Sequence, residues 1–201
     1  MATWVKICGV TRAADALAAF ECGADAIGIN FWPGSKRYCE RSRARDLVAA
    51  LPSASLVYGV FVGATRAEIS AIVREVGLTG VQFHGGEAEE EAEGWDLPVI
   101  RAVAATSREA VSSALAARAT YRVLVDHAAG GGSGLTVDTA LLDGLDLSRA
   151  VLAGGLTPHN VAASVARLRP FGVDTAGGVE TAPGIKDARL IEAFIRNARG
   201  A

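Results

Sequence analysis

The sequence predicts an α/β fold, a single (β/α)8 TIM barrel, and three observations lead to that prediction. Apolar runs of strand length alternate with helical stretches along the chain, eight of each. Such alternation implies parallel strands joined by right-handed crossovers, and eight units can close into a barrel without exposed edges. The chain has 201 residues, fewer than the ~250 typical of this fold, so no inserted domain fits. We therefore expect residues 1–201 to form one barrel domain.

The expected strands and helices follow one another in regular order. The apolar runs that predict strands cover residues 4–8, 26–31, 56–62, 80–83, 99–104, 121–126, 150–153 and 172–175. Periodicity or composition predicts helices over residues 13–22, 40–51, 66–76, 108–117, 158–168 and 187–198, with short ones at 87–92 and 139–142.

Residues at the ends of these stretches support several boundaries. Thr65 and Glu68 have capping-box spacing at the start of the 66–76 helix, and Gly77 follows that helix. Thr157 is a candidate cap with Pro158 at the first helical position. These cap and glycine residues therefore agree with the predicted alternation of strands and helices.

An open doubly wound sheet is the alternative architecture. Its dinucleotide fingerprint is absent, because Gly9 is the single glycine after the first strand. The glycine-rich stretch 130–134 is not followed by the lysine and hydroxyl residue of a P-loop. As a linker it would leave too few strands downstream for a second core, so we interpret it as a loop over the active site. We expect no nucleotide cofactor.

Composition and charge narrow the function classes. The formal charge is only −2 and the basic residues are scattered, which argues against nucleic-acid binding. No apolar run approaches the ~20 residues of a membrane span, and no secretory signal is visible, so we expect a cytoplasmic protein. Cys8, Cys22 and Cys39 lack the spacing of a metal or redox motif and are interpreted as reduced thiols.

Two ionisable side chains end strands at the predicted barrel mouth. Cys8 ends the first strand and Asp126 ends the sixth, where barrel enzymes place their chemistry. A thiolate can remove a proton and a carboxylic acid can deliver one, if neighbours adjust each pKa. The structural alternatives are a small buried hydrophobe for Cys8 and a cap or turn residue for Asp126.

Lys6 lies on the same strand face as Cys8, one step deeper in the barrel. A buried lysine needs a partner, and Asp174 on the eighth strand is the candidate, because the eighth strand neighbours the first in a closed barrel. This pair would set the field around Cys8. Schiff-base chemistry by Lys6 is the competing interpretation.

Glycines end the seventh and eighth strands, where barrels commonly bind phosphate. The two pairs are Gly154 with Gly155 and Gly177 with Gly178. Their bare N–H groups favour an anion, as do the positive ends of two predicted helices, a short one after Gly178 and the one starting near Pro158, although tight turns also use glycine.

Two further side chains follow strands at the same mouth. Arg37 follows the second strand and can grip a carboxylate in two places, or remain a solvated surface residue. His84 ends the fourth strand. Together with His127, the residues Cys8, His84 and Asp126 could be imagined as zinc ligands, but no local pair has known ligand spacing. We expect no metal.

A set of motifs spread over nearly the whole chain closely resembles phosphoribosylanthranilate isomerase. The motifs are Lys6-Ile7-Cys8-Gly9-Val10-Thr11-Arg12, Ser35-Lys36-Arg37, Gly59-Val60-Phe61-Val62, Val81-Gln82-Phe83-His84-Gly85, Leu124-Val125-Asp126, Gly131-Gly132-Ser133-Gly134, Leu152-Ala153-Gly154-Gly155-Leu156 and Gly178-Val179-Glu180. The first motif and the loop after Asp126 are the specific ones.

The resemblance implies an intramolecular oxidoreductase of the aldose–ketose isomerase type, acting in tryptophan biosynthesis without a cofactor. It implies that Asp126 protonates the ribose ring oxygen and that Cys8 removes the proton from the sugar C2. Arg37 matches the position that holds the anthranilate carboxylate, Gly154, Gly155, Gly177 and Gly178 match the phosphate-binding segments, and His84 lines the mouth.

The chain departs from the family pattern at Lys36, at Ala176-Gly177 and at residues 135–138. These departures concern lid closure and phosphate affinity and leave the acid and the base untouched. The alternatives are isomerisation of another phosphorylated aminoaldose and a non-catalytic barrel that binds a phosphate ligand. We expect a small phosphorylated substrate, no nucleic-acid or membrane partner, and a monomer, with a homodimer as the alternative.

Overall fold

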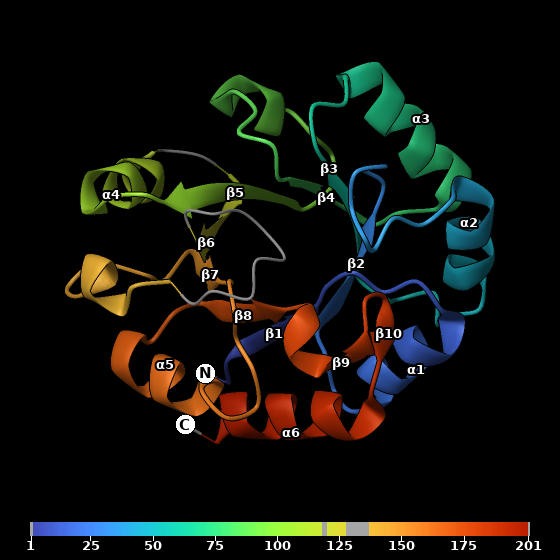
Figure 1. The fold of residues 1–201 in the computed structure, drawn as a ribbon. Helices are drawn as coiled ribbons and strands as arrows, with labels where there is room; N and C mark the ends of the chain where they lie inside the picture. Colours follow the sequence, from blue (N-terminus) through green and yellow to red (C-terminus); the bar gives the residue numbers. More distant parts are fainter. Residues whose placement is uncertain (1, 118–119, 128–136, 201) are drawn as a thin grey trace.

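The computed structural model describes residues 2–117, 120–127 and 137–200, and eight of its strands form a closed parallel barrel (Figure 1). In order around the barrel these are β1 (Trp4–Ile7), β2 (Ala26–Asn30), β3 (Val57–Phe61), β4 (Gly80–Phe83), β5 (Val99–Ala105), β6 (Arg122–His127), β7 (Ala150–Leu152) and β8 (Gly172–Thr175). The pairing of β1 with β8 closes the barrel and sets Lys6 opposite Asp174. The predicted fold class is confirmed.

Helices surround the strands in Figure 1. They are α1 (Ala13–Glu21), α2 (Arg41–Ala49), α3 (Arg66–Val76), α4 (Arg108–Ala116), α5 (Val161–Leu168) and α6 (Ala188–Arg199). Where they are described, the connections after β4 and β6 carry short 3-10 helices, η1 (Glu89–Ala92) and η2 (Thr139–Leu142). None of the helices in the described ranges is long and apolar enough to cross a membrane.

The segment after β8 differs from a simple crossover. A three-residue 3-10 turn, η3 (Gly177–Val179), leads into a hairpin of β9 (Glu180–Ala182) and β10 (Ile185–Lys186) before α6 begins. The sequence predicted only a short helix after Gly178. The hairpin proves central to the site, because it carries Lys186, which donates to Cys8 O, and Glu180, which pairs with Lys186.

Local hydrogen bonds explain which helix ends were predicted correctly. The capping box between Thr65 and Glu68 is present, and Gly77 ends α3 at φ 80°. The prediction that a helix begins at Pro158 is wrong, because α5 begins at Val161. Asn160 accepts a hydrogen bond from the Thr157 N–H and donates one to Gly155 O, so its side chain stabilises a turn there instead.

Two apolar regions hold the barrel together. The larger lies between the strands and the helices, and the smaller fills the lower barrel interior with side chains from alternate strand positions, namely Ala26, Tyr58, Ile100, Leu124, Val151 and Ala153. One step nearer the carboxyl ends, the interior becomes polar, with buried Lys6, Gln82, Asp126 and Asp174. This polar layer supports the candidate site.

Candidate active site

Cys8 and Asp126 lie at the carboxyl ends of β1 and β6, as the sequence predicted. Cys8 follows the last residue of β1, is partly exposed, and donates its N–H to Thr175 O at 2.8 Å. Asp126 is 5% exposed within β6. Because β1 and β6 are not neighbours in the barrel, the thiol and the carboxyl group approach the mouth from different sides.

Lys6 forms the predicted ion pair with Asp174. Lys6 Nζ lies 2.8 Å from Asp174 Oδ1, and both side chains are buried. Burial would lower the pKa of the Lys6 ammonium, but Asp174 and then Cys8 raise it above its usual value. Lys6 is therefore a permanent cation beneath the thiol, and this charge does not suit the neutral amine that Schiff-base formation needs.

Gly28 provides the space that brings Lys6 and Cys8 together. A Cβ atom at Gly28 would lie 2.9 Å from Cys8 Sγ and 3.1 Å from Lys6 Nζ. Any side chain there would displace the thiol or the ammonium. Glycine at this inward-facing position of β2 is thus required by the site, and not by backbone conformation.

The pKa of the Cys8 thiol reflects opposing influences. Burial raises that pKa above its usual value, and Asp174 acts in the same direction. The ammonium groups of Lys6 and Lys186 act in the opposite direction. Burial thus disfavours the thiolate form of Cys8, and two neighbouring cations favour it.

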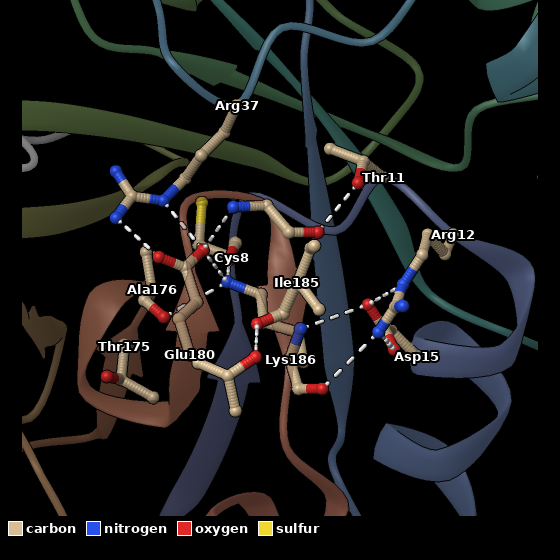
Figure 2. A network of polar contacts seen from close by, with 12 residues as sticks. Cys8, Thr11, Arg12, Asp15, Arg37, Thr175, Ala176, Glu180, Ile185 and Lys186 are labelled. Atoms are coloured by element: carbon tan, nitrogen blue, oxygen red, sulfur yellow. Dashed lines mark hydrogen bonds and ion pairs between the residues drawn. The ribbon is translucent and has the colours of Figure 1, made fainter.

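Lys186 is the second cation, and the sequence did not single it out (Figure 2). Its side chain is 1% exposed and its Nζ donates to Cys8 O at 2.6 Å, to Ala176 O at 3.0 Å and to Glu180 Oε1 at 2.7 Å. All three ammonium protons thus have an acceptor. One side chain joins the end of β1, the segment after β8 and the hairpin.

Glu180 connects Lys186 to Arg37. Arg37 Nε donates to Glu180 Oε1 at 2.8 Å and Arg37 Nη2 to Oε2 at 2.7 Å, a two-pronged ion pair. Burial would raise the pKa of Glu180, but the hydrogen bonds from Arg37 and Lys186 lower it below its usual value. Arg37 lies at the mouth as predicted, and one edge of its guanidinium is already held by the protein.

Residue usage offered one indication of this network. Only three of the 20 basic residues in the chain are lysines, namely Lys6, Lys36 and Lys186. Lysine presents a compact charge with three donors, whereas arginine presents a planar, forked set of donors. In a chain whose basic residues are mostly arginine, a lysine therefore indicates a position where a compact charge is needed. Lys6 and Lys186 are buried beside Cys8, and Lys36 is exposed.

The acid side of the mouth is built by β4 and β6. His84 Nε2 lies 3.2 Å from Asp126 Oδ2, and the His127 N–H donates to Asp126 Oδ1 at 2.8 Å. Gln82 Nε2 lies 3.1 Å from His84 Nδ1. The His84 ring thus lies between the Gln82 amide and the Asp126 carboxyl group. His84 therefore holds the carboxyl group directly, a role beyond lining the mouth.

A cavity of about 440 Å³ opens beside Asp126, His84 and His127, with Arg101 and Glu89 also in its wall. The glycine-rich loop 130–134, interpreted from the sequence as a cover for the active site, lies outside the described residues. Among the residues that are described, no three His, Cys, Asp or Glu side chains form a group that could hold a metal ion.

The two glycine segments lie against each other at the mouth. A Cβ atom at Gly178 would lie only 1.9 Å from Leu156 O, so these backbones touch. Gly154 has φ 77° and Gly155 has φ 60°, values that favour glycine. Gly154 also packs on Asp126, since a Cβ there would be 2.8 Å from Oδ1, and Gly177 packs on Arg37. Each glycine thus has a conformational or packing reason besides anion binding.

Comparisons with known proteins agree along the whole chain. The family model for N-(5'phosphoribosyl)anthranilate (PRA) isomerase matches residues 5–197. The N-(5'-phosphoribosyl)anthranilate isomerase of Myxococcus xanthus is 45% identical over 206 residues, covering 99% of this chain and 97% of the relative. The Pseudomonas fluorescens enzyme of the same name is 44% identical over 198 residues, covering 96% and 97%.

Solved structures give the same result. The crystal structure of phosphoribosyl anthranilate isomerase from Thermotoga maritima superimposes with a TM-score of 0.88 at 39% identity, over 99% of this chain and 100% of that one. A phosphoribosyl anthranilate isomerase in complex with reduced 1-(o-carboxyphenylamino)-1-deoxyribulose 5-phosphate gives a TM-score of 0.83 at 37% identity, over 99% and 100%. The chain belongs to the N-(5'-phosphoribosyl)anthranilate isomerase family.

Proposed function

We propose that this chain isomerises N-(5'-phosphoribosyl)anthranilate to 1-(o-carboxyphenylamino)-1-deoxyribulose 5-phosphate with Cys8 as the general base and Asp126 as the general acid. The reaction is an Amadori rearrangement of tryptophan biosynthesis. The observation that supports these roles is the separation of the two groups: a thiol set among cations at the end of β1, and a carboxyl group held by His84 at the end of β6.

Ring opening is the first step. Asp126 gives its proton to the ribose ring oxygen, and the C1–O bond breaks to leave an iminium ion between the sugar and the anthranilate nitrogen. His84 Nε2 contacts one oxygen of the carboxyl group and the His127 N–H donates to the other, which fixes its plane. An orienting contact on each oxygen suits a group that must deliver one proton in one direction.

Proton abstraction is the second step. The iminium makes the C2 proton acidic, and the Cys8 thiolate removes it to give an enolamine, which tautomerises to the ketone. Each proton-transfer group contributes about 10² to 10⁴ in rate. No cofactor takes part in this sequence, because both steps move only protons and the electrons of the substrate.

Substrate binding follows from the groups around the mouth. Glu180 holds the Nε and Nη2 edge of Arg37, which leaves the second edge of the guanidinium for the anthranilate carboxylate. The touching segments at Gly154, Gly155, Gly177 and Gly178 offer backbone N–H groups for the phosphate. His84 contacts the anthranilate side of the mouth next to Asp126.

The protein works in the cytoplasm as one domain over residues 1–201, and as a monomer. A homodimer is the alternative, since a related Thermotoga maritima structure is described as a monomeric form generated from a dimeric isomerase. Light scattering on a size-exclusion column distinguishes the two, with a mass near 20.7 kDa expected for the monomer.

The decisive experiment generates N-(5'-phosphoribosyl)anthranilate in the cuvette and follows the loss of its fluorescence. We expect Cys8→Ala and Asp126→Asn each to lower kcat by at least about 10² with an unchanged circular dichroism spectrum. Cys22→Ala, which removes a thiol outside the mouth, serves as the matched control and should retain normal turnover. Near-normal turnover in either site variant would contradict its role.

Two other functions predict different results in the same assay. A barrel that only binds a phosphate ligand would not accelerate the fluorescence loss at all. An isomerase for another phosphorylated aminoaldose would act on that sugar in preference, and Arg37→Met would leave its KM unchanged because such a substrate lacks the anthranilate carboxylate.

A further inference from the structure

The buried ammonium of Lys186 is the best-satisfied charge beside Cys8, and the proton transfers above do not use it. Its three donors meet three acceptors at 2.6–3.0 Å, two of which are main-chain carbonyls of Cys8 and Ala176 (Figure 2). Desolvation disfavours a buried cation, so these contacts must compensate for a real cost. Removing the ammonium alone would take a donor from the Glu180 carboxylate and from two carbonyl oxygens, so the position is tied to its partners.

The hairpin fixes Lys186 from both ends. Its own N–H donates to Asp15 Oδ2 at 3.1 Å, and the Gly184 N–H donates to Glu180 Oε1 at 3.0 Å. Thr11, which follows β1, donates its hydroxyl to Gly184 O at 2.7 Å. The hairpin is thus tied to the segment after β1 on two sides, and Lys186 has little freedom to leave the thiol.

The charges around Cys8 do not balance. Four charged side chains interact with it, namely Lys6 from β1, Asp174 from β8, Arg37 from the loop after β2 and Lys186 from the hairpin, and Glu180 pairs with the last two. Three of these five side chains are cations and two are anions. The cluster therefore carries one excess positive charge, and a thiolate at Cys8 would neutralise it.

We propose that Lys186 is a positioning residue of the isomerisation: it holds the main chain of Cys8 against the Arg37–Glu180 pair, and its charge favours the thiolate form of Cys8. The inference rests on the proposed function in taking Cys8 as the base. Lys186 touches neither the substrate nor the reacting atoms, and it acts through Cys8 and Glu180. The ammonium groups of Lys186 and Lys6 and the guanidinium of Arg37 each interact electrostatically with Cys8.

Lysine alone fits this position among the basic residues. The three acceptors converge on one point, Nζ, which suits a compact ammonium and not a planar guanidinium. Glutamine is the informative replacement, because it keeps two N–H donors while it removes the charge. Lys186→Gln therefore separates the electrostatic contribution from the hydrogen bonds, and Lys186→Met removes both.

The test measures the thiol directly, without turnover. The rate of iodoacetamide alkylation of Cys8 is followed by mass spectrometry of its peptide across pH, because only the thiolate reacts. The midpoint of the plot of this rate against pH gives the apparent pKa of the Cys8 thiol. We expect Lys186→Gln and Lys186→Met to move this midpoint upward by about one pH unit. Glu180→Gln, which removes a negative charge, should move it downward. Lys36→Met removes an exposed lysine and should leave the midpoint unchanged.

The opposite signs distinguish charge from general disruption. A loosened site would move both glutamine variants in the same direction, and that result would overturn the proposal, as would a wild-type midpoint in Lys186→Gln. Circular dichroism identifies a variant that fails to fold. If a Lys186 variant does so, the direction of the midpoint shift in Glu180→Gln still tests whether the charges of the hairpin set the pKa of Cys8. Turnover of Cys8→Ala tests the proposed function separately, so either conclusion can fail alone.

In the turnover assay, Lys186→Gln should lower kcat/KM about tenfold at neutral pH, and kcat/KM should recover toward higher pH. The reason is that raising the pKa of the Cys8 thiol by one unit reduces the thiolate fraction about tenfold at pH values below the pKa. A loss that does not change with pH would show that Lys186 has only a structural role.

Discussion

The base side and the acid side of the mouth are built in different ways. Cys8 lies beside a network of five charged side chains whose donors and acceptors are matched to one another. Asp126, in contrast, lies 3.2 Å from His84 Nε2 and accepts the main-chain N–H of His127. One region places several charged side chains around its reacting group, and the other contacts its reacting group with one imidazole ring and one main-chain N–H.

The difference follows from what each group must do. A base has to become an anion, and fixed cations lower the cost of that charge. An acid has to begin protonated, and a lysine or arginine in direct contact would favour the ionised carboxylate instead. Within the part of the chain that the structure describes, Asp126 forms no ion pair with a lysine or arginine and is contacted instead by the His84 ring, whose other nitrogen lies 3.1 Å from Gln82 Nε2.

Lys6→Met should break the base side with the largest effect. It leaves Asp174 buried without its partner, and removing one member of a buried pair costs about 3–5 kcal/mol of unfolding free energy. Urea unfolding measures the loss. The control is the double variant Lys6→Met/Asp174→Leu, which should recover most of the stability. A double variant as unstable as the single one would mean that the pair does not explain the loss.

His84→Leu should weaken the acid side by a smaller amount. Asp126 loses its contact with the imidazole but keeps the hydrogen bond from the His127 N–H, so we expect kcat to fall about tenfold. The matched variant His84→Gln retains an N–H donor and should retain more turnover. Equal losses in the two variants would mean that the imidazole ring, rather than its donor, is what matters.

Glu180 gives the base side a pH-dependent stability. Its pKa in the folded protein lies below the ordinary value of 4.5, so its contribution is complete above that value and is lost as pH falls through the folded pKa. We expect the wild type to melt about 2–4 °C above Glu180→Gln at pH 7, and this gap to narrow below pH 4.5. A gap that stays constant with pH would contradict the ion-pair explanation.

The smallest effect is expected far from both regions. Arg167 pairs with Asp143 on the surface, where both side chains are about half exposed and the ion pair is screened. Arg167→Ala should change neither the melting temperature nor turnover measurably. It calibrates the scatter against which the other three variants are judged.

Sequence reasoning reached the barrel and its central ion pair because both depend on strand order. Once β8 neighbours β1, alternation along the strands puts Lys6 opposite Asp174 without further information. The same reasoning placed Cys8 and Asp126 at strand ends.

The hairpin network could not be predicted in this way. Glu180 and Lys186 lie in the short hairpin that follows β8, and no barrel periodicity relates its residues to the strands of the barrel. Lys186 precedes a helix and looks like an ordinary solvated lysine, while Arg37 looks free to bind a carboxylate. Their partners depend on how the loop folds back, and that depends on tertiary contacts such as the Thr11 hydroxyl with Gly184 O.

The surroundings of Cys8 also determine when the site can exist. Asp174 follows its partner Lys6 by 168 positions in the chain, and Lys186 follows its partner Cys8 by 178. During synthesis the thiol therefore emerges long before three of the charged groups of its network, Asp174, Glu180 and Lys186. Until these have been made, the nascent chain carries an ordinary cysteine, and the charged site forms only when β8 and the hairpin close the ring.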